Sequence, residues 1–400
     1  MTADAVPTLP ITRTCPYAPP AEHRRLREET PLAKVRLPNG VTVWAATRHE
    51  DIRAILSDPR FSSDRSNPGF PRLRQDPPPP SLIRKPLLIS MDLPEHGPAR
   101  RAVVGEFTVK RMAALTPRIQ QIVDEHIDAM LAGPRPVDLV QALSLPVPSL
   151  VICEMLGVPY ADHEFFQTRS THLVSHKTPA EVVGRSFAEL LGYLNTLVTA
   201  KEQNPTDDLL GRQILKHREE GTYDHEAMLG LAFILLIAGH ETTANMISLS
   251  TLVLLQNPEK LSALRQDPSK TLAAVEELLR YFTIAESGLG RVATEDVEIG
   301  GVLIRAGEGV LALANTGNRD PEVFENADEL DLERGARNHL AFGFGPHQCL
   351  GQNLARLELQ IVIDTLFRRI PGLRPAVPVE ELSFKDDATV YGIREFPVTW

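Results

Sequence analysis

A ten-residue segment, FGFGPHQCLG at 342–351, constrains the fold most strongly because it specifies both a backbone shape and a reactive side chain. Its three glycines and one proline favour a tight turn over a helix or a strand. A periodic apolar pattern over 350–368 follows, so Cys349 stands where a helix begins. The N–H groups and the dipole of a helix N-terminus stabilise negative charge, which lowers the pKa of a thiol placed there. The segment therefore predicts a thiolate at Cys349.

The rest of the sequence decides between a reactive thiol and an inert one. Neither other cysteine, Cys15 or Cys153, lies near Cys349 in the sequence, so no disulfide or zinc site is indicated. An inert thiol in a glycine turn is the alternative for Cys349. The pattern Phe-Gly-x-Gly-x-His-x-Cys-x-Gly is matched at every fixed position, which favours a functional thiolate.

Through this pattern the sequence resembles the haem-thiolate monooxygenases, the cytochromes P-450, and details elsewhere resemble actinobacterial members. The resemblance implies haem b as cofactor, with Phe342 and Gly343 in the haem-binding loop and Cys349 as the axial iron ligand. Thiolate donation to haem iron favours cleavage of the O–O bond. The resemblance also implies a mainly α fold with small β-sheets, shaped as a triangular helical prism around a buried haem.

The composition indicates one soluble domain that occupies the whole chain, 1–400. With 42% hydrophobic residues the chain can bury a large core, and no Gly/Ser linker or repeat divides it. The net charge of −10 argues against a nucleic-acid partner. The apolar run at 227–239 is too short to cross a bilayer, and 1–20 contains no apolar signal core. We therefore expect a cytoplasmic monomer without a membrane anchor.

The longest periodic segment, 225–256, predicts a helix of about 50 Å with apolar residues on nearly every face. Within it, the sequence AGHETT at 238–243 places residues that are poor choices for a buried helix, as expected at a functional site. A threonine hydroxyl can bond to a carbonyl one turn earlier and open the helix, and Gly239 leaves room for a ligand. The resemblance implies that Glu241 and Thr242 deliver protons during the reaction. The alternative is a kinked helix with satisfied polar groups.

A haem carries two propionates, and buried carboxylates require cationic or hydrogen-bonding partners. His96 and Arg100 are four residues apart near the start of a predicted helix and share one face. Alone, such a pair would more often be a surface feature. The resemblance implies that both bind propionates, together with Arg291 and His339.

A Glu-x-x-Arg pattern on the predicted helix at 271–282 has a structural interpretation. Glu277 and Arg280 are three residues apart and can pair across one helical turn. The pattern is common on surface helices and carries little weight alone. The resemblance implies a buried network with Arg334 that stabilises the fold and takes no part in catalysis.

The resemblance and the apolar residues expected near the haem imply a large hydrophobic substrate, such as a polyketide, a sterol-like molecule or a xenobiotic. The expected wall residues are Leu87, Leu88, Leu235, Ala238, Gly239, Leu289 and Val390. A long loop at 62–85 is expected to cover the substrate-binding cavity. Either Arg72 or Arg84 of this loop would bind the polar end of the substrate; the alternative is that both are solvated charges.

No flavin- or NAD-binding segment is found in the sequence, so electrons must come from outside. The resemblance implies a ferredoxin and a ferredoxin reductase as partners, with O2 as oxidant. The cationic residues expected to receive the ferredoxin are Arg101, Arg111, His347 and Arg356. Two alternatives share the cofactor: a peroxide-driven peroxygenase and a haem-based sensor or carrier without turnover. The Glu241–Thr242 pair argues against both.

Overall fold

Helix α9 (His225–Leu255) is the axis of the fold, as the long apolar pattern predicted. It begins at Asp224, whose carboxylate accepts a hydrogen bond of 2.8 Å from a backbone N–H in the first turn. Its most extensive helix contacts are with α5 (Pro146–Leu156), α7 (Ala180–Gln203) and α13 (Gln352–Arg369). Because α9 has neighbours on several sides, it needs apolar residues on several faces.

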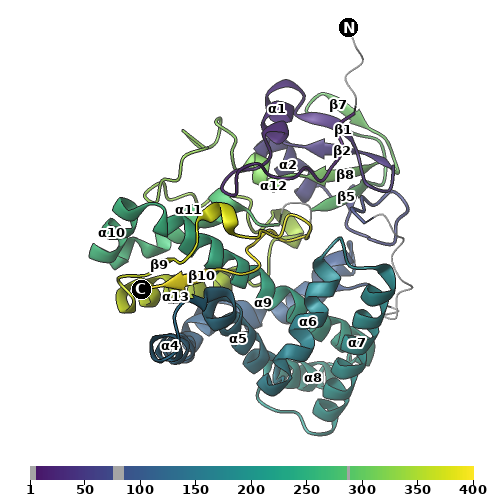
Figure 1. Cartoon of the computed structure of the whole chain (residues 1–400). Coiled ribbons are helices and arrows are strands. Elements are labelled where there is room, and N and C mark those ends of the chain that lie inside the picture. The colour runs from purple at the N-terminus through teal and green to yellow at the C-terminus, as the bar shows by residue number, and fades with distance from the viewer. Residues whose placement is uncertain (1–5, 75–84, 286–288) are drawn as a thin grey trace.

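The structure, a computed structural model, describes residues 6–74, 85–285 and 289–400. Most helices gather around α9, and α1, α2 and α12 lie beside the main sheet (Figure 1). The remaining α-helices are α1 (Ala21–Glu29), α2 (His49–Ser57), α3 (His96–Val104), α4 (Val109–Ala132), α6 (His163–Val174), α8 (Leu209–Glu219), α10 (Pro258–Gln266), α11 (Thr271–Phe282) and α12 (Ala314–Gly317).

The main sheet has the strand order β1-β2-β8-β5-β3. Its strands are β1 (Leu32–Arg36), β2 (Thr42–Ala46), β3 (Phe61–Ser62), β5 (Gly290–Ala293) and β8 (Gly309–Ala312). The hairpin β1–β2 turns at Gly40, whose φ of +82° suits glycine. β2 pairs parallel with β8, and β8 pairs antiparallel with β5, which places Arg291 opposite Val310.

Two smaller sheets complete the described strands, which agrees with the expected mainly α fold. One has the order β4-β10-β9, and the other is the hairpin β6–β7. Their strands are β4 (Val137–Asp138), β6 (Val297–Ile299), β7 (Val302–Ile304), β9 (Arg374–Pro375) and β10 (Pro397–Thr399). By length and composition, α9 is the one helix in the described part of the chain that could cross a membrane; here it lies within the packed helices.

A buried ion-pair network fastens α11 to the irregular segment before the Cys349 loop. Arg280 donates from Nε to Glu277 Oε2 at 2.7 Å, and neither side chain is exposed. The same guanidinium donates to the carbonyls of Asn318 and Ala327. Arg334 Nε reaches Glu277 Oε1 at 3.2 Å. These three side chains therefore form a buried network of the kind that the sequence led us to expect.

Candidate active site

The segment that holds Cys349 is a short loop before α13. Gly343 and Gly345 have φ of +69° and +73°, a conformation that glycine adopts without strain. A side chain at Gly345 would also come within 2.6 Å of the Leu56 carbonyl oxygen. The N–H of Cys349 donates to the Phe342 carbonyl at 2.8 Å and closes the loop on itself. The glycines therefore allow a backbone that fixes the position of the thiol.

The Cys349 side chain is solvent-accessible, although many protein atoms surround its sulfur. This burial raises the pKa of the thiol, against the N–H of Gly351 and the charges of Arg100 and Arg356, which lower it. The expectation that the helix start would lower the thiol pKa is therefore outweighed by burial. A metal cation at the sulfur would reverse the balance, since it deprotonates a coordinating thiol.

Cys349 is isolated from other potential metal ligands. Across the described ranges, no group of three or more His, Cys, Asp or Glu side chains could hold a metal ion. A metal bound to this thiol would therefore take its other ligands from a cofactor, as haem iron does from porphyrin.

Four nitrogen-bearing side chains, those of His96, Arg100, Arg291 and His347, form a cluster beside the loop. His96, at the start of α3, is buried, and its Nε2 has no hydrogen-bond partner in the described structure. Its ring stacks on that of His347, with centroids 4.0 Å apart. Arg100 donates to the Gln348 carbonyl at 2.5 Å, and Arg291 is buried on β5. Burial lowers the pKa of Arg291 to about 10.

This cluster fits the two propionates of a haem. Among the ion pairs of the described residues, none includes the half-buried Arg100 or the buried Arg291, although an arginine as buried as Arg291 is normally paired. Burial, followed by the charges of Arg291, His96 and Arg100, lowers the pKa of His347 to about 3. His347 is therefore neutral, and both histidines can donate one hydrogen bond without adding positive charge.

His339 does not join this cluster, so its expected role toward a propionate needs correction. Its Nε2 lies 3.0 Å from Glu276 Oε2, and its Nδ1 accepts from the N–H of Ala341 at 3.1 Å. Both ring nitrogens are thus engaged within the protein. His347 occupies the position beside Arg291 instead. Sequence reasoning assigned His347 to the ferredoxin surface, although its place two residues before Cys349 was the available signal.

Arg356 also needs correction as a ferredoxin contact. Its guanidinium pairs with Glu276, with Nη2 to Oε2 at 3.1 Å, and lies over the Phe342 ring at 4.6 Å. These contacts fix the Cys349 loop against α11. Arg101 and Arg111 are exposed, as a docking role requires, although Arg111 lies 3.4 Å from Glu106.

The side-chain bond expected at Thr242 is present, although α9 continues as a regular α-helix through this residue. Its Oγ1 donates to the Ala238 carbonyl at 2.9 Å, one turn earlier. Ala238 is exposed in the middle of this otherwise buried helix, so this part of α9 opens onto free space. The Thr242 oxygen keeps its acceptor capacity, because the bond to Ala238 uses the hydroxyl hydrogen.

Gly239 has a different role from the one expected. A side chain at Gly239 would come within 2.7 Å of Ile152 Cγ1 on α5. The glycine therefore permits close packing of α5 against α9, and it does not leave room for a ligand. The sequence cannot distinguish these roles, since both require the absence of a side chain.

Glu241 is buried, and its two oxygens have different environments. Oε1 lies 3.1 Å from Nζ of Lys385, whereas Oε2 has no hydrogen-bond partner among the described residues. Lys385 Nζ also donates to Asn245 Oδ1 at 2.9 Å. Lys385 follows α9 by 130 residues, and no local sequence pattern indicates a partner on that helix, so its role could not be predicted.

The expected wall residues are distributed over several cavities and the core. Leu87 and Leu88 line a cavity of about 460 Å³ between the start of α9, α3 and α8. Leu289 lines a smaller cavity together with Arg65, Arg291 and His347. Leu235 and Val390 are buried.

The arginines of the expected covering loop are directed toward backbone. Arg72 donates to the Arg65 carbonyl at 2.6 Å within its own loop, which gives no support to a substrate-binding role. Arg74 instead crosses to the segment between α6 and α7, where it donates to the carbonyls of Ser175, at 2.7 Å, and Thr178. Arg84 lies outside the described residues.

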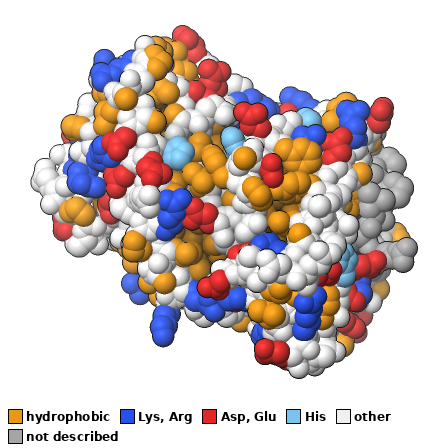
Figure 2. Space-filling view, turned by 90° about the horizontal axis from the view of Figure 1, so that it is seen from below, with side chains coloured by type: hydrophobic (Ala, Val, Ile, Leu, Met, Phe, Trp, Pro, Cys, Tyr) orange, Lys and Arg blue, Asp and Glu red, His pale blue; other side chains and the backbone are white. Residues whose placement is uncertain are grey.

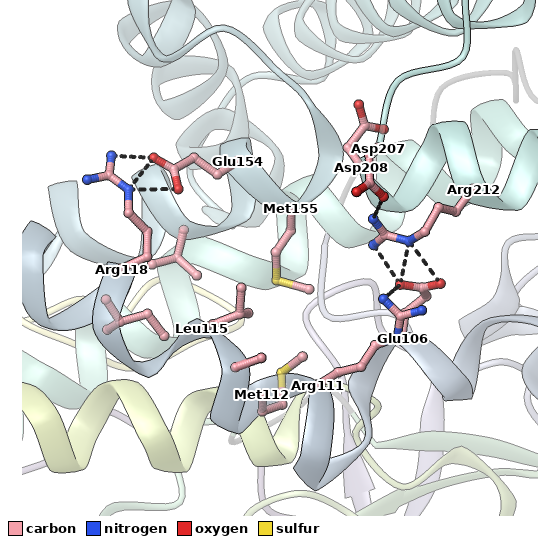
Figure 3. Close-up of a pocket in the computed structure, with 13 residues that line it drawn as sticks. Glu106, Arg111, Met112, Leu115, Arg118, Glu154, Met155, Asp207, Asp208 and Arg212 are labelled. Carbon is pink, nitrogen blue, oxygen red and sulfur yellow. Dashed lines mark hydrogen bonds and ion pairs between the residues drawn. The ribbon is translucent and has the colours of Figure 1, made fainter.

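A further cavity, of about 310 Å³, lies between α4, α5 and α8 and has a partly apolar floor (Figure 3). Its charges are paired: Arg118 with Glu154, and Arg212 with Glu106 and Asp207. It contains neither the thiol nor the Glu241–Thr242 pair, so we do not assign the reaction to it.

On the face seen from below, positive and negative side chains are interspersed (Figure 2).

This chain is similar to known proteins over nearly its whole length. A model of the cytochrome P450 family matches residues 193–370. The crystal structure of cytochrome P450 MoxA from Nonomuraea recticatena is 60% identical, with a TM-score of 0.91 and coverage of 98% of both chains. The mycinamicin VIII C21 methyl hydroxylase MycCI from Micromonospora griseorubida is 39% identical, with a TM-score of 0.94, covering 99% of this chain and 100% of that chain. The vitamin D3 dihydroxylase of Streptomyces griseolus is 48% identical, covering 100% and 98%.

Proposed function

Because this chain belongs to the cytochrome P450 family and is a haem-thiolate monooxygenase, we propose that Cys349 binds the iron of haem b and that the substrate is an extended apolar molecule. The single observation that carries the assignment of the haem site is the cluster beside the thiol. His96 and Arg291 are buried and Arg100 and His347 are half-buried, and the two arginines have no carboxylate partner among the described residues. Two propionates would supply the missing acceptors.

A haem-thiolate centre, when bound, supplies oxygen activation and attack on an unactivated C–H bond. The protein's own part is to position the substrate, exclude water and deliver protons. Glu241 Oε2 is the buried oxygen that is available to take and release a proton. Thr242 Oγ1 is held by the Ala238 carbonyl and can accept a hydrogen bond from a water or from the proton carrier.

The substrate is proposed to be a polyketide, a sterol-like molecule or another extended apolar compound. Leu87 and Leu88 offer apolar surface to a cavity of about 460 Å³, which suits such a ligand. The similarity to a mycinamicin VIII hydroxylase and to a vitamin D3 dihydroxylase supports the same class. Arg74 donates hydrogen bonds to two carbonyls of the segment between α6 and α7. These bonds would help to keep the substrate-binding cavity closed.

Electrons are proposed to come from a ferredoxin and its reductase, and the enzyme to work as a monomer in the cytoplasm. The exposed Arg101 and Arg111 support docking of an acidic partner. A peroxide-driven peroxygenase would not need a proton-delivering acid, and a sensor would not need turnover. The buried Glu241 beside Thr242 favours the monooxygenase.

One experiment separates these three functions. The purified holoenzyme is supplied with NADPH, a ferredoxin and its reductase, or with hydrogen peroxide alone, and a panel of polyketides and sterols is screened for spin-state shifts and products. A monooxygenase gives hydroxylated product that depends on NADPH and O2. Product formation from peroxide alone at an equal rate would indicate the peroxygenase, and haem binding without product in either assay would indicate a sensor or carrier.

A further inference from the structure

Lys385 connects the C-terminal segment of the chain to the proposed proton-delivering acid. Its side chain is 16% exposed, and its Nζ lies 3.1 Å from Glu241 Oε1 and 2.9 Å from Asn245 Oδ1. Glu241 and Asn245 are one helical turn apart, so they present their oxygens on the same face of α9. A single ammonium group therefore bridges two successive turns of the helix next to Thr242.

The backbone around Lys385 is built for this contact. Its N–H donates to the Gly392 carbonyl at 2.9 Å, and Phe384 pairs with Ile393 in an isolated bridge. A side chain at Gly392 would come within 2.1 Å of Asn245 Oδ1, so glycine is required for this segment to approach α9. These contacts hold Lys385 at one position along the helix.

The pairing is also asymmetric. Among the ion pairs of the described residues, Lys385 is the one cation that contacts Glu241. It contacts Oε1, and Oε2 stays buried without a hydrogen-bond partner in the described structure. A buried carboxylate is costly without a counter-charge, and the Lys385 ammonium provides one. The pairing thus restrains one oxygen and leaves the other for proton exchange.

We propose that Lys385 is a positioning residue that holds Glu241 through Oε1 and so directs Oε2 toward the proton path, a role that rests on the proton delivery proposed for Glu241. When Glu241 releases a proton from Oε2, it becomes a carboxylate, and the Lys385 ammonium balances the charge. A proton from solvent then restores the acid.

The test compares Lys385→Met, Lys385→Gln and Lys385→Arg in the holoenzyme, with and without Glu241→Gln. Lys260→Met, at an exposed position on α10, is the matched control. The first readout is the fraction of NADPH electrons lost to hydrogen peroxide. We expect Met and Gln to raise this loss several-fold, Arg to restore at least half of the coupling, and the control to change nothing. The change should disappear in the Glu241→Gln background.

The second readout does not depend on activity. Lys385→Met should lower the thermal unfolding midpoint more in the wild-type background than in the Glu241→Gln background, because each variant removes the same pair. Equal peroxide loss in Lys385→Gln and wild type, or equal effects of Lys385→Met in both backgrounds, would overturn the positioning role. If Glu241→Gln alone kept full coupling, the proton-delivery role of Glu241 would fail first. The carbon monoxide spectrum of every variant is the control for haem loss. If all variants retain it, a change in peroxide loss reflects Lys385 or Glu241 and not a loss of haem.

Discussion

The imidazole rings of His96 and His347 stack with centroids 4.0 Å apart and planes inclined by 30°, between the charges of Arg100 and Arg291. Burial and these charges lower the pKa of both rings, that of His347 to about 3. Two neutral imidazoles beside two arginines can therefore donate hydrogen bonds to two carboxylates without a large excess of positive charge. The stack joins α3 to the Cys349 loop at the site where the propionates are proposed to bind.

Removal of Arg291 should weaken haem binding. Arg291→Ala leaves one propionate without its charged partner, and a hydrogen bond to a charged group contributes roughly 1.5–3 kcal/mol. We expect haem transfer to an acceptor protein to become about ten-fold to a hundred-fold faster. Arg305→Ala, at an exposed position, is the control. Equal transfer rates for the Arg291 variant and the control would remove Arg291 from the haem site.

Removal of the Thr242 hydroxyl should divert electrons from product to peroxide. Thr242→Ala keeps the helix but loses the oxygen that would accept a hydrogen bond in the proton path. Thr196→Ala is a matched control, because Thr196, at an exposed position on α7, makes the same bond to the carbonyl four residues earlier, at 3.1 Å. The measurement is product formed per NADPH consumed. Unchanged coupling in Thr242→Ala would refute the role of this hydroxyl.

Glu358 on α13 should make the protein less stable as pH rises. It is buried beside Thr243, and burial outweighs the effect of the Thr243 hydroxyl and raises the pKa of Glu358 to about 8 from an ordinary value of 4.5. The folded state therefore binds more protons than the unfolded state between about pH 4.5 and 8, and the contribution of Glu358 to stability falls across that window.

Glu358→Gln should flatten this dependence, by up to about 1.4 kcal/mol per pH unit within the window. Glu259→Gln, at an exposed position on α10, is the control. Denaturant unfolding of both variants at several pH values provides the measurement. A Glu358→Gln variant with the pH slope of the wild type would show that this carboxyl is already charged at neutral pH.

Arg74 should control the mobility of the segment between α6 and α7. Arg74→Ala removes the bonds to the carbonyls of Ser175 and Thr178, so amide exchange in 174–178 should become faster, by about ten-fold for bonds worth about 1.4 kcal/mol in total. Arg72→Ala, which loses a bond within its own loop, should leave exchange in 174–178 unchanged. Equal exchange in both variants would show that the segment is held by other contacts.

The sequence could predict the elements whose chemistry is local. The Cys349 loop could be predicted from its glycines and its cysteine, and α9 from its long apolar pattern. The functional role of Glu241 and Thr242 could be predicted because an acid and a β-branched residue are poor choices inside a buried helix. Each of these signals lies within a short stretch of sequence. The structure agrees with the prediction for these elements, because the glycine-rich backbone and the apolar pattern are compatible with few other local folds.

The sequence failed where a role depends on distant partners. His339 and His347 have the same chemistry, and only the tertiary fold pairs the first with Glu276 and the second with His96. Gly239 was assigned to ligand space because Ile152, its neighbour across the helix interface, lies 87 residues earlier in the chain. Lys385 had no local pattern at all.

The ligation of haem iron by Cys349 is the central claim, and the carbon monoxide spectrum of the reduced protein tests it most directly. The wild type should show the long-wavelength Soret band that is characteristic of thiolate-ligated haem. Cys349→His should lose that band while Cys153→Ser, at a buried thiol remote from the loop, should retain it. A Cys349→His variant that kept the band would contradict the assignment of Cys349 as the iron ligand.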